Sequence, residues 1–283
     1  MHLAILRMKN IANRCILLLL GSLALFNASP ALGQKKGPSL KIMSYNIHHA
    51  NPPSLPGVIN TDTIGALISK YRPDLVALQE VDVNTSRSGK SLDEAKAIAD
   101  KAGLYYRFAK AIDYAGGEYG VAILSRYPFD SFVVHKLPSA TAKAEARVLA
   151  VGFFHVGKTH FIFACTHLDA EGGNASRLMQ IHVIDTILSK ERVPVLLAGD
   201  LNSEPSNPVM QIFDEHFQRS CMDSSEYTFP SDRPVKTIDY IGVSKNKPAR
   251  VVEHRVLPET FPSDHRSIWA EIQIAGSAKR NNK

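Results

Sequence analysis

Five short polar clusters, each closing an apolar run typical of a β-strand, carry the residue types that hydrolyse phosphate esters. If the strands are neighbours, carboxylate and amide oxygens from several clusters would meet and could bind a hard divalent ion. Histidines beside such an ion could handle protons during hydrolysis. The pattern therefore predicts a metal-assisted phosphoesterase site. The clusters are Ser44-Tyr45-Asn46, Gln79-Glu80, Thr166-His167-Leu168-Asp169, Gly199-Asp200-Leu201-Asn202 and Ser263-Asp264-His265.

Asn46 and Glu80 end two hydrophobic strand-like runs that a single helical stretch connects. A helical crossover of this kind predicts that the two strands are adjacent. An amide oxygen and a carboxylate at one sheet edge suit Mg²⁺, which takes one or two carboxylates together with waters and phosphate oxygens. Each residue taken alone is also compatible with a solvated strand end.

Asp200 and Asn202 flank Leu201, so on an extended backbone both side chains point the same way. Such a pair can fix a nucleophilic water and hold a phosphoryl oxygen. The same residues are equally compatible with a turn, because Gly199-Asp200 and the following polar residues have turn chemistry.

Two histidines, His167 and His265, lie at strand ends with acidic residues available to orient them. A carboxylate behind an imidazole fixes its tautomer and raises its basicity. We expect Asp239 to support His265 and Glu118 to support His167. A structural role is the alternative for either histidine.

The pattern of apolar runs predicts two mixed β-sheets packed face to face with helices outside. Inner strands covered on both faces would lack alternation, as Val195-Leu196-Leu197-Ala198 does. Helices are expected at 61–71, at 91–103 with a Ser91-x-x-Glu94 capping box, at 175–190, and in a short stretch after Pro205. Strands are expected at 40–47, 74–81, 104–110, 119–125, 130–137, 146–156, 159–168, 193–199, 237–243, 250–257 and 266–274.

Residues 1–33 are typical of a cleaved signal peptide, because three basic residues precede an apolar run from Ile16 to Phe26. Small residues at positions 31 and 33 predict cleavage before Gln34. The remaining residues 34–283 are expected to form a single domain, secreted or periplasmic. An uncleaved membrane anchor is the alternative, but the run is shorter than the roughly 20 residues of a membrane span.

Loss of residues 1–33 removes three basic residues and no acidic ones, which lowers the formal net charge from +6 to +3. No concentrated stripe of lysine and arginine is present, so a dedicated nucleic-acid binder is not favoured. Cys165 and Cys221 would be the cysteines that remain. They could pair, but Cys165 lies in an apolar run, which favours a buried free thiol.

The order of these clusters along the chain and their residue sequences resemble the motifs of the endonuclease/exonuclease/phosphatase superfamily, over about residues 39–274. Members of that superfamily include deoxyribonucleases, abasic-site endonucleases, neutral sphingomyelinases and inositol-polyphosphate 5-phosphatases. The resemblance implies a four-layered α/β/β/α sandwich. It rests on Met43-Ser44-Tyr45-Asn46, Leu78-Gln79-Glu80-Val81, Ala122-Ile123-Leu124-Ser125-Arg126, Thr166-His167-Leu168, Gly199-Asp200-Leu201-Asn202, Ile238-Asp239-Tyr240 and Ser263-Asp264-His265.

The resemblance also implies roles for individual residues. In-line attack of an activated water on phosphorus would need a divalent metal and a group that takes the proton, which is either Asp200 or His265. Arg147 and Tyr119 resemble residues that contact the phosphate and the leaving-group side, and Arg126 is the competing choice for the arginine. The implied metal ligands are Asn46, Glu80 and Asp264, and the implied catalytic residues are Asp200, Asn202, Asp239, His265 and His167, the last also contacting the phosphate.

The sequence therefore predicts a secreted, monomeric hydrolase of phosphodiesters or phosphomonoesters that depends on Mg²⁺ or Mn²⁺. A small or lipid-linked phosphodiester is the favoured substrate. A secreted nuclease of the same superfamily is the main alternative, and nucleic acid is a possible partner. A third reading is an inactive binding protein on this scaffold, which the complete set of reactive residues argues against.

Overall fold

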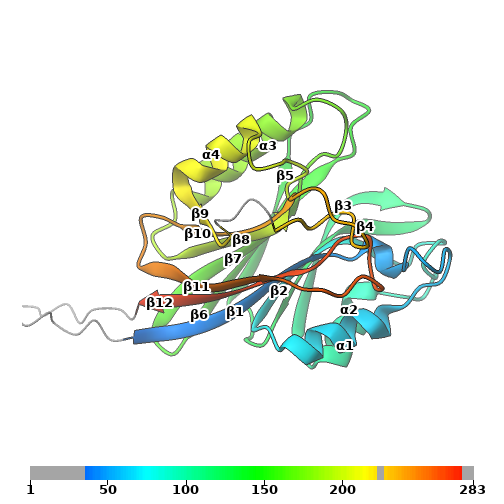
Figure 1. The fold of residues 1–283 in the computed structure, drawn as a ribbon, viewed down its shortest axis with the longest axis horizontal. Coiled ribbons are helices and arrows are strands. Elements are labelled where there is room, and N and C mark those ends of the chain that lie inside the picture. Colours follow the sequence, from blue (N-terminus) through cyan, green and yellow to red (C-terminus); the bar gives the residue numbers. More distant parts are fainter. Residues whose placement is uncertain (1–35, 222–225, 276–283) are drawn as a thin grey trace, which may run out of the picture. The chain divides into compact units, whose positions relative to one another are not determined.

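Two six-stranded β-sheets pack face to face in the computed structural model, which describes residues 36–221 and 226–275 (Figure 1). We call them sheet A and sheet B, and the described residues belong to one compact unit. In spatial order, sheet A contains β11 (Ala249–Val256), β12 (Ile268–Ala275), β1 (Lys36–Asn46), β2 (Leu75–Val83), β4 (Gly117–Ser125) and β3 (Tyr105–Tyr114). Sheet B contains β5 (Ser131–Leu137), β6 (Arg147–Val156), β7 (Thr159–His167), β8 (Val195–Asp200), β10 (Asp239–Ser244) and β9 (Phe217–Arg219).

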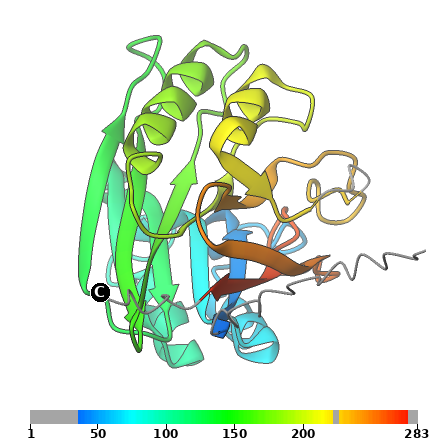
Figure 2. The same ribbon diagram turned by 90° about the vertical axis from the view of Figure 1, so that its left-hand side faces the viewer.

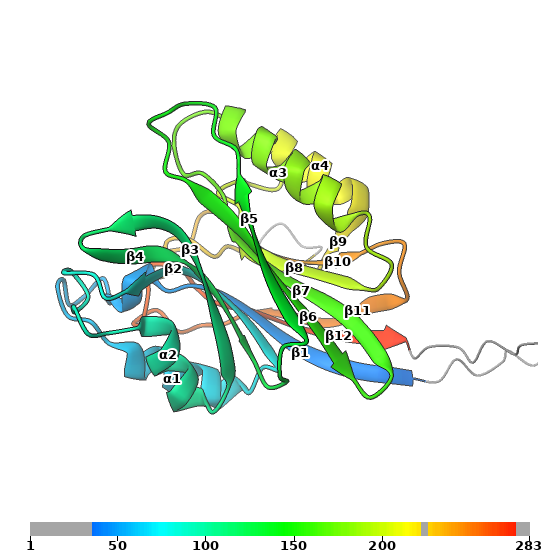
Figure 3. The ribbon, with the colours of Figure 1, turned by 180° about the vertical axis from the view of Figure 1, so that it is seen from behind.

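Four α-helices of the described chain cover the outer faces of the two sheets, and Figures 2 and 3 show these layers from two sides. α1 (Thr61–Tyr71) and α2 (Glu94–Ala102) pack on sheet A, and α3 (Ala175–Leu188) and α4 (Pro208–His216) pack on sheet B. This arrangement confirms the predicted α/β/β/α sandwich of mixed sheets.

The central strands are covered on both faces, which explains why their sequences lack alternation. In β7, Phe161 and Phe163 lie in the apolar core between the sheets, whereas Ile162 and Ala164 face the helices. All four side chains are buried. Burial of this apolar area, at about 25 cal/mol per Å², is the main force holding the layers together.

Each sheet has one parallel pair at its centre, and every other neighbouring pair is antiparallel. β1 pairs with β2, and β7 pairs with β8, each through a helical crossover. Asn46 lies opposite Gln79 and His167 lies opposite Asp200 in these registers. The polar clusters therefore lie together at the carboxyl ends of the parallel strands.

Local details correct three predictions. The described residues contain twelve strands rather than eleven, because the three-residue β9 is too short for alternation to reveal it. α2 begins at Glu94 with Asp93 as its N-cap, whose side chain accepts from the Lys96 amide, so Ser91 does not form the expected capping box. Helix α3 ends at Leu188 rather than at residue 190.

Cys165 is a fully buried free thiol, as predicted, and is not joined to Cys221. No helix within the described residues is long and apolar enough to cross a membrane. The predicted signal peptide at residues 1–33 lies outside the described residues and stays a prediction.

Candidate active site

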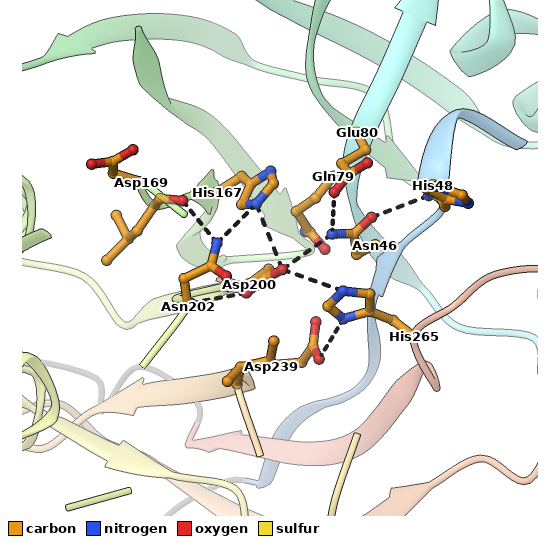
Figure 4. Close-up of polar contacts among 12 residues, drawn as sticks. Asn46, His48, Gln79, Glu80, His167, Asp169, Asp200, Asn202, Asp239 and His265 are labelled. Carbon is orange, nitrogen blue, oxygen red and sulfur yellow. Dashed lines mark hydrogen bonds and ion pairs between the residues drawn. The ribbon is translucent and has the colours of Figure 1, made fainter. Parts of the chain in front are cut away.

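Asp200 lies at the centre of a polar cluster at the rim where the parallel strands end (Figure 4). It is the last residue of β8 and is 1 % exposed. Its Oδ2 accepts a hydrogen bond from Asn46 Nδ2 at 3.1 Å. The same oxygen lies 3.6 Å from Nε2 of His167 and 3.7 Å from Nε2 of His265. Asp200 is thus the carboxylate that both histidines share.

The structure brings His265 and Asp239 together as an oriented pair. Nδ1 of His265 lies 3.0 Å from Oδ2 of Asp239, and both side chains are buried. Asp239 begins β10 directly opposite Asp200 in the antiparallel register. Both ring nitrogens of His265 therefore face carboxylates, an arrangement that favours the doubly protonated imidazolium.

The pKa values of this cluster follow from burial and from its unusual density of charge. Burial alone would lower the pKa of His265, but the carboxylates of Asp239, Asp200 and Asp264 outweigh it and raise the pKa to about 10. For Asp200, burial and the nearby Asp239 raise the pKa to about 7. A carboxyl group with a pKa near neutrality can both take up and release a proton under ordinary conditions.

His167 has a different environment, because a cation rather than a carboxylate lies at its Nδ1. Nη1 of Arg147 is 3.1 Å from Nδ1, and Nδ2 of Asn202 is 3.1 Å from Nε2. Burial, then the charges of Arg147 and His265, lower the pKa of His167 well below its ordinary value, so this ring is neutral. The expected support from Glu118 is wrong, since Glu118 pairs with Lys110 at 3.0 Å.

The three predicted metal ligands adjoin one cavity. Asn46 Nδ2 donates to Glu80 Oε1 at 2.9 Å, and Glu80 and Asp264 line the cavity. The Ser263 hydroxyl donates to the carbonyl oxygen of Asn46 at 2.7 Å and ties the loop that carries Asp264 to the end of β1. Half-buried carboxylate oxygens beside an amide are hard donors, and this donor set fits a divalent cation such as Mg²⁺.

A second set of ligand atoms also lies at this rim. Asp200, Asp239 and His265 have ligand atoms within 4.8 Å of one another, and all three residues are buried. This group contains none of the predicted metal ligands. The rim therefore offers oxygen donors on both sides of the cavity.

Arg147, Tyr119 and Arg126 lie at two different ends of the molecule. Arg147 is 6 % exposed, contacts His167 and pairs with Glu145 at 2.8 Å. Tyr119 is 7 % exposed, and burial followed by the charge of Glu80 raises its pKa. Arg126 follows β4 and pairs with Asp74 at 3.2 Å, just before the amino end of β2 and away from the rim. Arg147 therefore adjoins the polar cluster around Asp200, and Arg126 does not.

The backbone carries strain where the functional side chains turn into the rim. Glu80 has a φ of 57° and Asn202 a φ of 46°, both in the left-handed region that non-glycine residues rarely adopt. The turn His48 to Ala50, which directly follows the end of β1, also has positive φ at all three residues. Strained non-glycine residues concentrate at functional sites because the surrounding fold must hold them there.

A cavity of about 640 Å³ opens over Asp200 and both histidines. Sequence reasoning missed the residues of its outer wall. Phe229 lies with its ring centroid 4.8 Å from that of His265, and Lys236 is on the same loop. Glu171 and Glu204 come from the loops after β7 and β8. These residues stand in loops without periodicity or a recognisable motif, so no local signal in the sequence could have found them.

Residues 43–265 match the model of the Endonuclease/Exonuclease/phosphatase family, and the chain belongs to this family. Its members are phosphoesterases and nucleases, and the family depends on divalent metals. No curated protein sequence gives a match to this chain.

Solved structures show the same fold at low sequence identity. An endonuclease/exonuclease/phosphatase from Beutenbergia cavernae is similar at 24% identity and a TM-score of 0.69, over 85% of this chain and 72% of that one. A mannosyl-6-phosphatase from Bacteroides thetaiotaomicron is similar at 18% identity and a TM-score of 0.67, over 82% and 99%. The human nocturnin catalytic domain, with a bound sulfate anion, is similar at 22% identity and a TM-score of 0.65, over 84% and 94%.

Proposed function

We propose that this protein is a secreted, divalent-metal-dependent phosphoesterase that hydrolyses a small phosphodiester or phosphomonoester by in-line attack of water. The observation that carries the proposal is the position of Asp200. Its carboxylate lies within 3.7 Å of two histidine nitrogens at the cavity. Hydrolysis at phosphorus needs an aligned nucleophile and charge stabilisation, and this cluster can supply both.

Asn46, Glu80 and Asp264 would hold Mg²⁺ or Mn²⁺. When bound there, the ion supplies positive charge against the phosphoryl oxygens and the departing alkoxide. The donor chemistry supports this assignment for Glu80 and Asp264, whose carboxylates line the cavity. Asn46 would turn its Oδ1 from the His48 amide toward the ion. The remaining polar side chains of the rim, across the cavity from the ion, add to this stabilisation of charge.

Asp200 takes the proton of the attacking water, and His265 does not. Both nitrogens of His265 face carboxylates, so its ring is already protonated and acts as a positive charge that stabilises the transferring phosphoryl group. Asp239 holds this ring in place. The backbone amide of Asn202 donates a hydrogen bond to Asp200 Oδ1 at 2.9 Å and so positions the base. Neutral His167, which lines the cavity, would contact the phosphoryl oxygens, and Arg147 behind it would hold the ring.

The charge of the cavity wall favours an uncharged or cationic leaving group over a nucleic acid strand. Five acidic residues line the cavity against two basic ones and the protonated His265, and a divalent ion held by Glu80 and Asp264 would offset two of the carboxylates. Arg177 uses its guanidinium to hold the loop after β7, donating to the carbonyl oxygens of Asp169 and Glu171. A second phosphate of a polyanion would meet the carboxylates of Glu171 and Glu204, which the bound ion would not neutralise. The acidic lining residues are Glu80, Glu171, Asp200, Glu204 and Asp264, and the basic ones are Arg177 and Lys236.

Secretion rests on the sequence of residues 1–33 alone. Export would place the enzyme with extracytoplasmic phosphate esters, including those of lipid headgroups. N-terminal sequencing of protein recovered from the native host should begin near Gln34. Recovery of intact Met1 in soluble cytoplasm would contradict export without affecting the chemistry.

The decisive experiment measures hydrolysis of bis-p-nitrophenyl phosphate, lipid headgroup diesters, sugar phosphates and plasmid DNA. Activity should vanish in EDTA and return with Mg²⁺ or Mn²⁺. Glu80→Gln should raise the metal concentration needed for half-maximal rate, while the matched control Glu215→Gln on the exposed face of α4 should not.

Full activity in EDTA would contradict metal dependence. Rapid nicking of plasmid DNA with no turnover of the small esters would establish the nuclease alternative. Folded protein that turns over none of these substrates would support the reading of an inactive binding scaffold.

A further inference from the structure

A second cluster of metal-ligating side chains lies at the edge of the sandwich, outside the cavity just described. Cys221 follows β9, the edge strand of sheet B, and His254 lies on β11, the edge strand of sheet A. Sγ of Cys221 and Nε2 of His254 each lie 3.2 Å from Oε2 of Glu226. All three ligand atoms lie within 4.8 Å of one another.

The imidazole of His254 is held as a ligand would be. Its Nδ1 lies 2.7 Å from the Ser220 hydroxyl, and the Ser220 amide donates to the Ile241 carbonyl at 2.8 Å, which anchors this contact to sheet B. Metal-ligating histidines typically bind such a partner through their second nitrogen, which fixes the tautomer and the ring orientation. This contact leaves Nε2 directed at Glu226 and Cys221.

Nε2 of His254 has an unmet bonding capacity. The side chain is only 9 % exposed, and Nε2 has no hydrogen-bond partner among the residues that the structure describes, although Glu226 Oε2 is 3.2 Å away. A buried polar atom without a partner costs free energy, so such an atom calls for an explanation. Burial lowers the pKa of His254 from its ordinary value.

We propose that Cys221, Glu226 and His254 bind a zinc ion that joins the edges of the two sheets. Thiolate, imidazole and carboxylate together are the ligand set of zinc, whereas Mg²⁺ takes oxygen ligands. Ligands at tetrahedral zinc, about 2.0 to 2.3 Å from the metal, lie roughly 3.3 to 3.6 Å apart. The observed 3.2 Å separations need only a small adjustment. Water would fill the fourth position.

Binding involves a balanced proton exchange. The Cys221 thiol donates to Glu226 in the metal-free state, and its proton leaves to solvent as the thiolate coordinates zinc. Affinity should therefore rise with pH.

The zinc site would also restrain the loop that carries Phe229, which lines the proposed catalytic cavity. Glu226 begins the segment that carries Phe229, and the Thr237 hydroxyl donates to the Glu226 carbonyl at 3.0 Å. Fixing Glu226 to β11 would restrain both ends of this loop. Zinc should raise the melting temperature of the protein even where the catalytic centre is saturated with Mg²⁺.

Cobalt titration tests the proposal, because a cobalt ion bound to a thiolate gives a charge-transfer absorption in the near ultraviolet. The protein is titrated with Co²⁺ under reducing conditions and a large excess of Mg²⁺. We expect this absorption to saturate at one equivalent and to disappear on addition of Zn²⁺. Ser220→Ala should weaken cobalt binding about 10- to 100-fold by releasing the His254 ring.

Cys221→Ser and His254→Gln should abolish the absorption, and Glu226→Gln should weaken binding. His182→Gln, on the exposed face of α3, is the matched control and should bind cobalt as the wild type does. Circular dichroism checks that each variant is folded. Absence of the absorption from folded wild-type protein, or its persistence in Cys221→Ser, would overturn the proposal.

Discussion

Asp82 and Asp200 are both fully buried aspartates on central strands, yet their surroundings differ in every respect that matters for chemistry. Asp82 accepts hydrogen bonds from the hydroxyls of Thr85 and Ser88, at 2.7 Å each, and from two nitrogens of Arg87. Asp200 shares its carboxylate with Asn46 and two histidines beside an open cavity.

The pKa values of the two carboxyl groups move in opposite directions. Burial alone would raise that of Asp82, but the hydrogen bonds from Arg87, Ser88 and Thr85 outweigh it and lower the pKa. The pKa of Asp200 rises to about 7. A carboxylate such as Asp82, whose oxygens accept hydrogen bonds from fixed donors on all sides, stays ionised and has a structural role. A carboxylate that shares its donors and faces solvent-filled space can exchange protons.

The largest effect should come from Asp200→Asn. Removing the base should lower kcat by roughly 10³-fold or more, because an amide cannot accept the proton of water. The fold should survive, since the substitution relieves the crowding of buried carboxylates. Steady-state kinetics and a thermal melt measure both quantities. A variant that keeps wild-type kcat would remove Asp200 from the chemical step.

The His265–Asp239 pair should give the next largest effect. His265→Gln and Asp239→Asn should each lower kcat by roughly 10²-fold, the scale of a well-positioned charged group. Their double variant should lose little beyond the worse single one, because residues that act as a unit are strongly non-additive. Additive losses would mean that the two residues act independently.

Asp82→Asn should affect stability rather than catalysis. The free energy of unfolding should fall by about 2–3 kcal/mol, because the half-buried Arg87 loses its charged partner. The control Asp113→Asn breaks an exposed pair with Lys110 and should change stability by less than about 0.5 kcal/mol. Urea unfolding measures the difference. A stable Asp82→Asn variant with a severe loss of kcat would contradict the structural role assigned to Asp82.

Glu94, which accepts a hydrogen bond from the backbone amide of Asp82 at 2.8 Å, should give the effect that depends most on pH. Burial raises the pKa of Glu94 to about 8, above its unfolded value. The unfolded chain therefore releases its proton first as pH rises, and stability is lost between about pH 4.5 and pH 8 at up to ~1.4 kcal/mol per unit. Glu94→Gln should flatten this slope in urea titrations. An equally steep slope in the variant would show that another group is responsible.

The sequence predicts most of the rim because its residues stand at strand ends, where local patterns are strong. Asn46, Glu80 and Asp200 follow buried runs whose period and length reveal the strands. The pairing of His265 with Asp239, 26 residues apart along the chain, was expected because an acidic residue near a strand end was available to orient the histidine, and the family resemblance implied the same pair.

What the sequence did not reveal depends on loops and on contacts between distant segments. Phe229 contacts His265 and lies in a loop with no periodicity. Glu118 pairs with Lys110 of the same hairpin instead of His167. The positive φ of Glu80 could not be read from its residue type, whereas asparagine, as at Asn202, is enriched in the left-handed region. The closeness of His254 to Cys221 requires the two sheets to be in place.

The order in which strands occur along the chain has a consequence for how the molecule is made. Sheet B uses β5 to β10, a continuous series, whereas sheet A uses β1 to β4 and then β11 and β12. During synthesis, sheet B can complete its hydrogen bonding while β1 still lacks its partner β12. The loop with Asp264 and His265 emerges just before β12. The cluster around Asp200 therefore gains His265 only after every strand of sheet B has been synthesised.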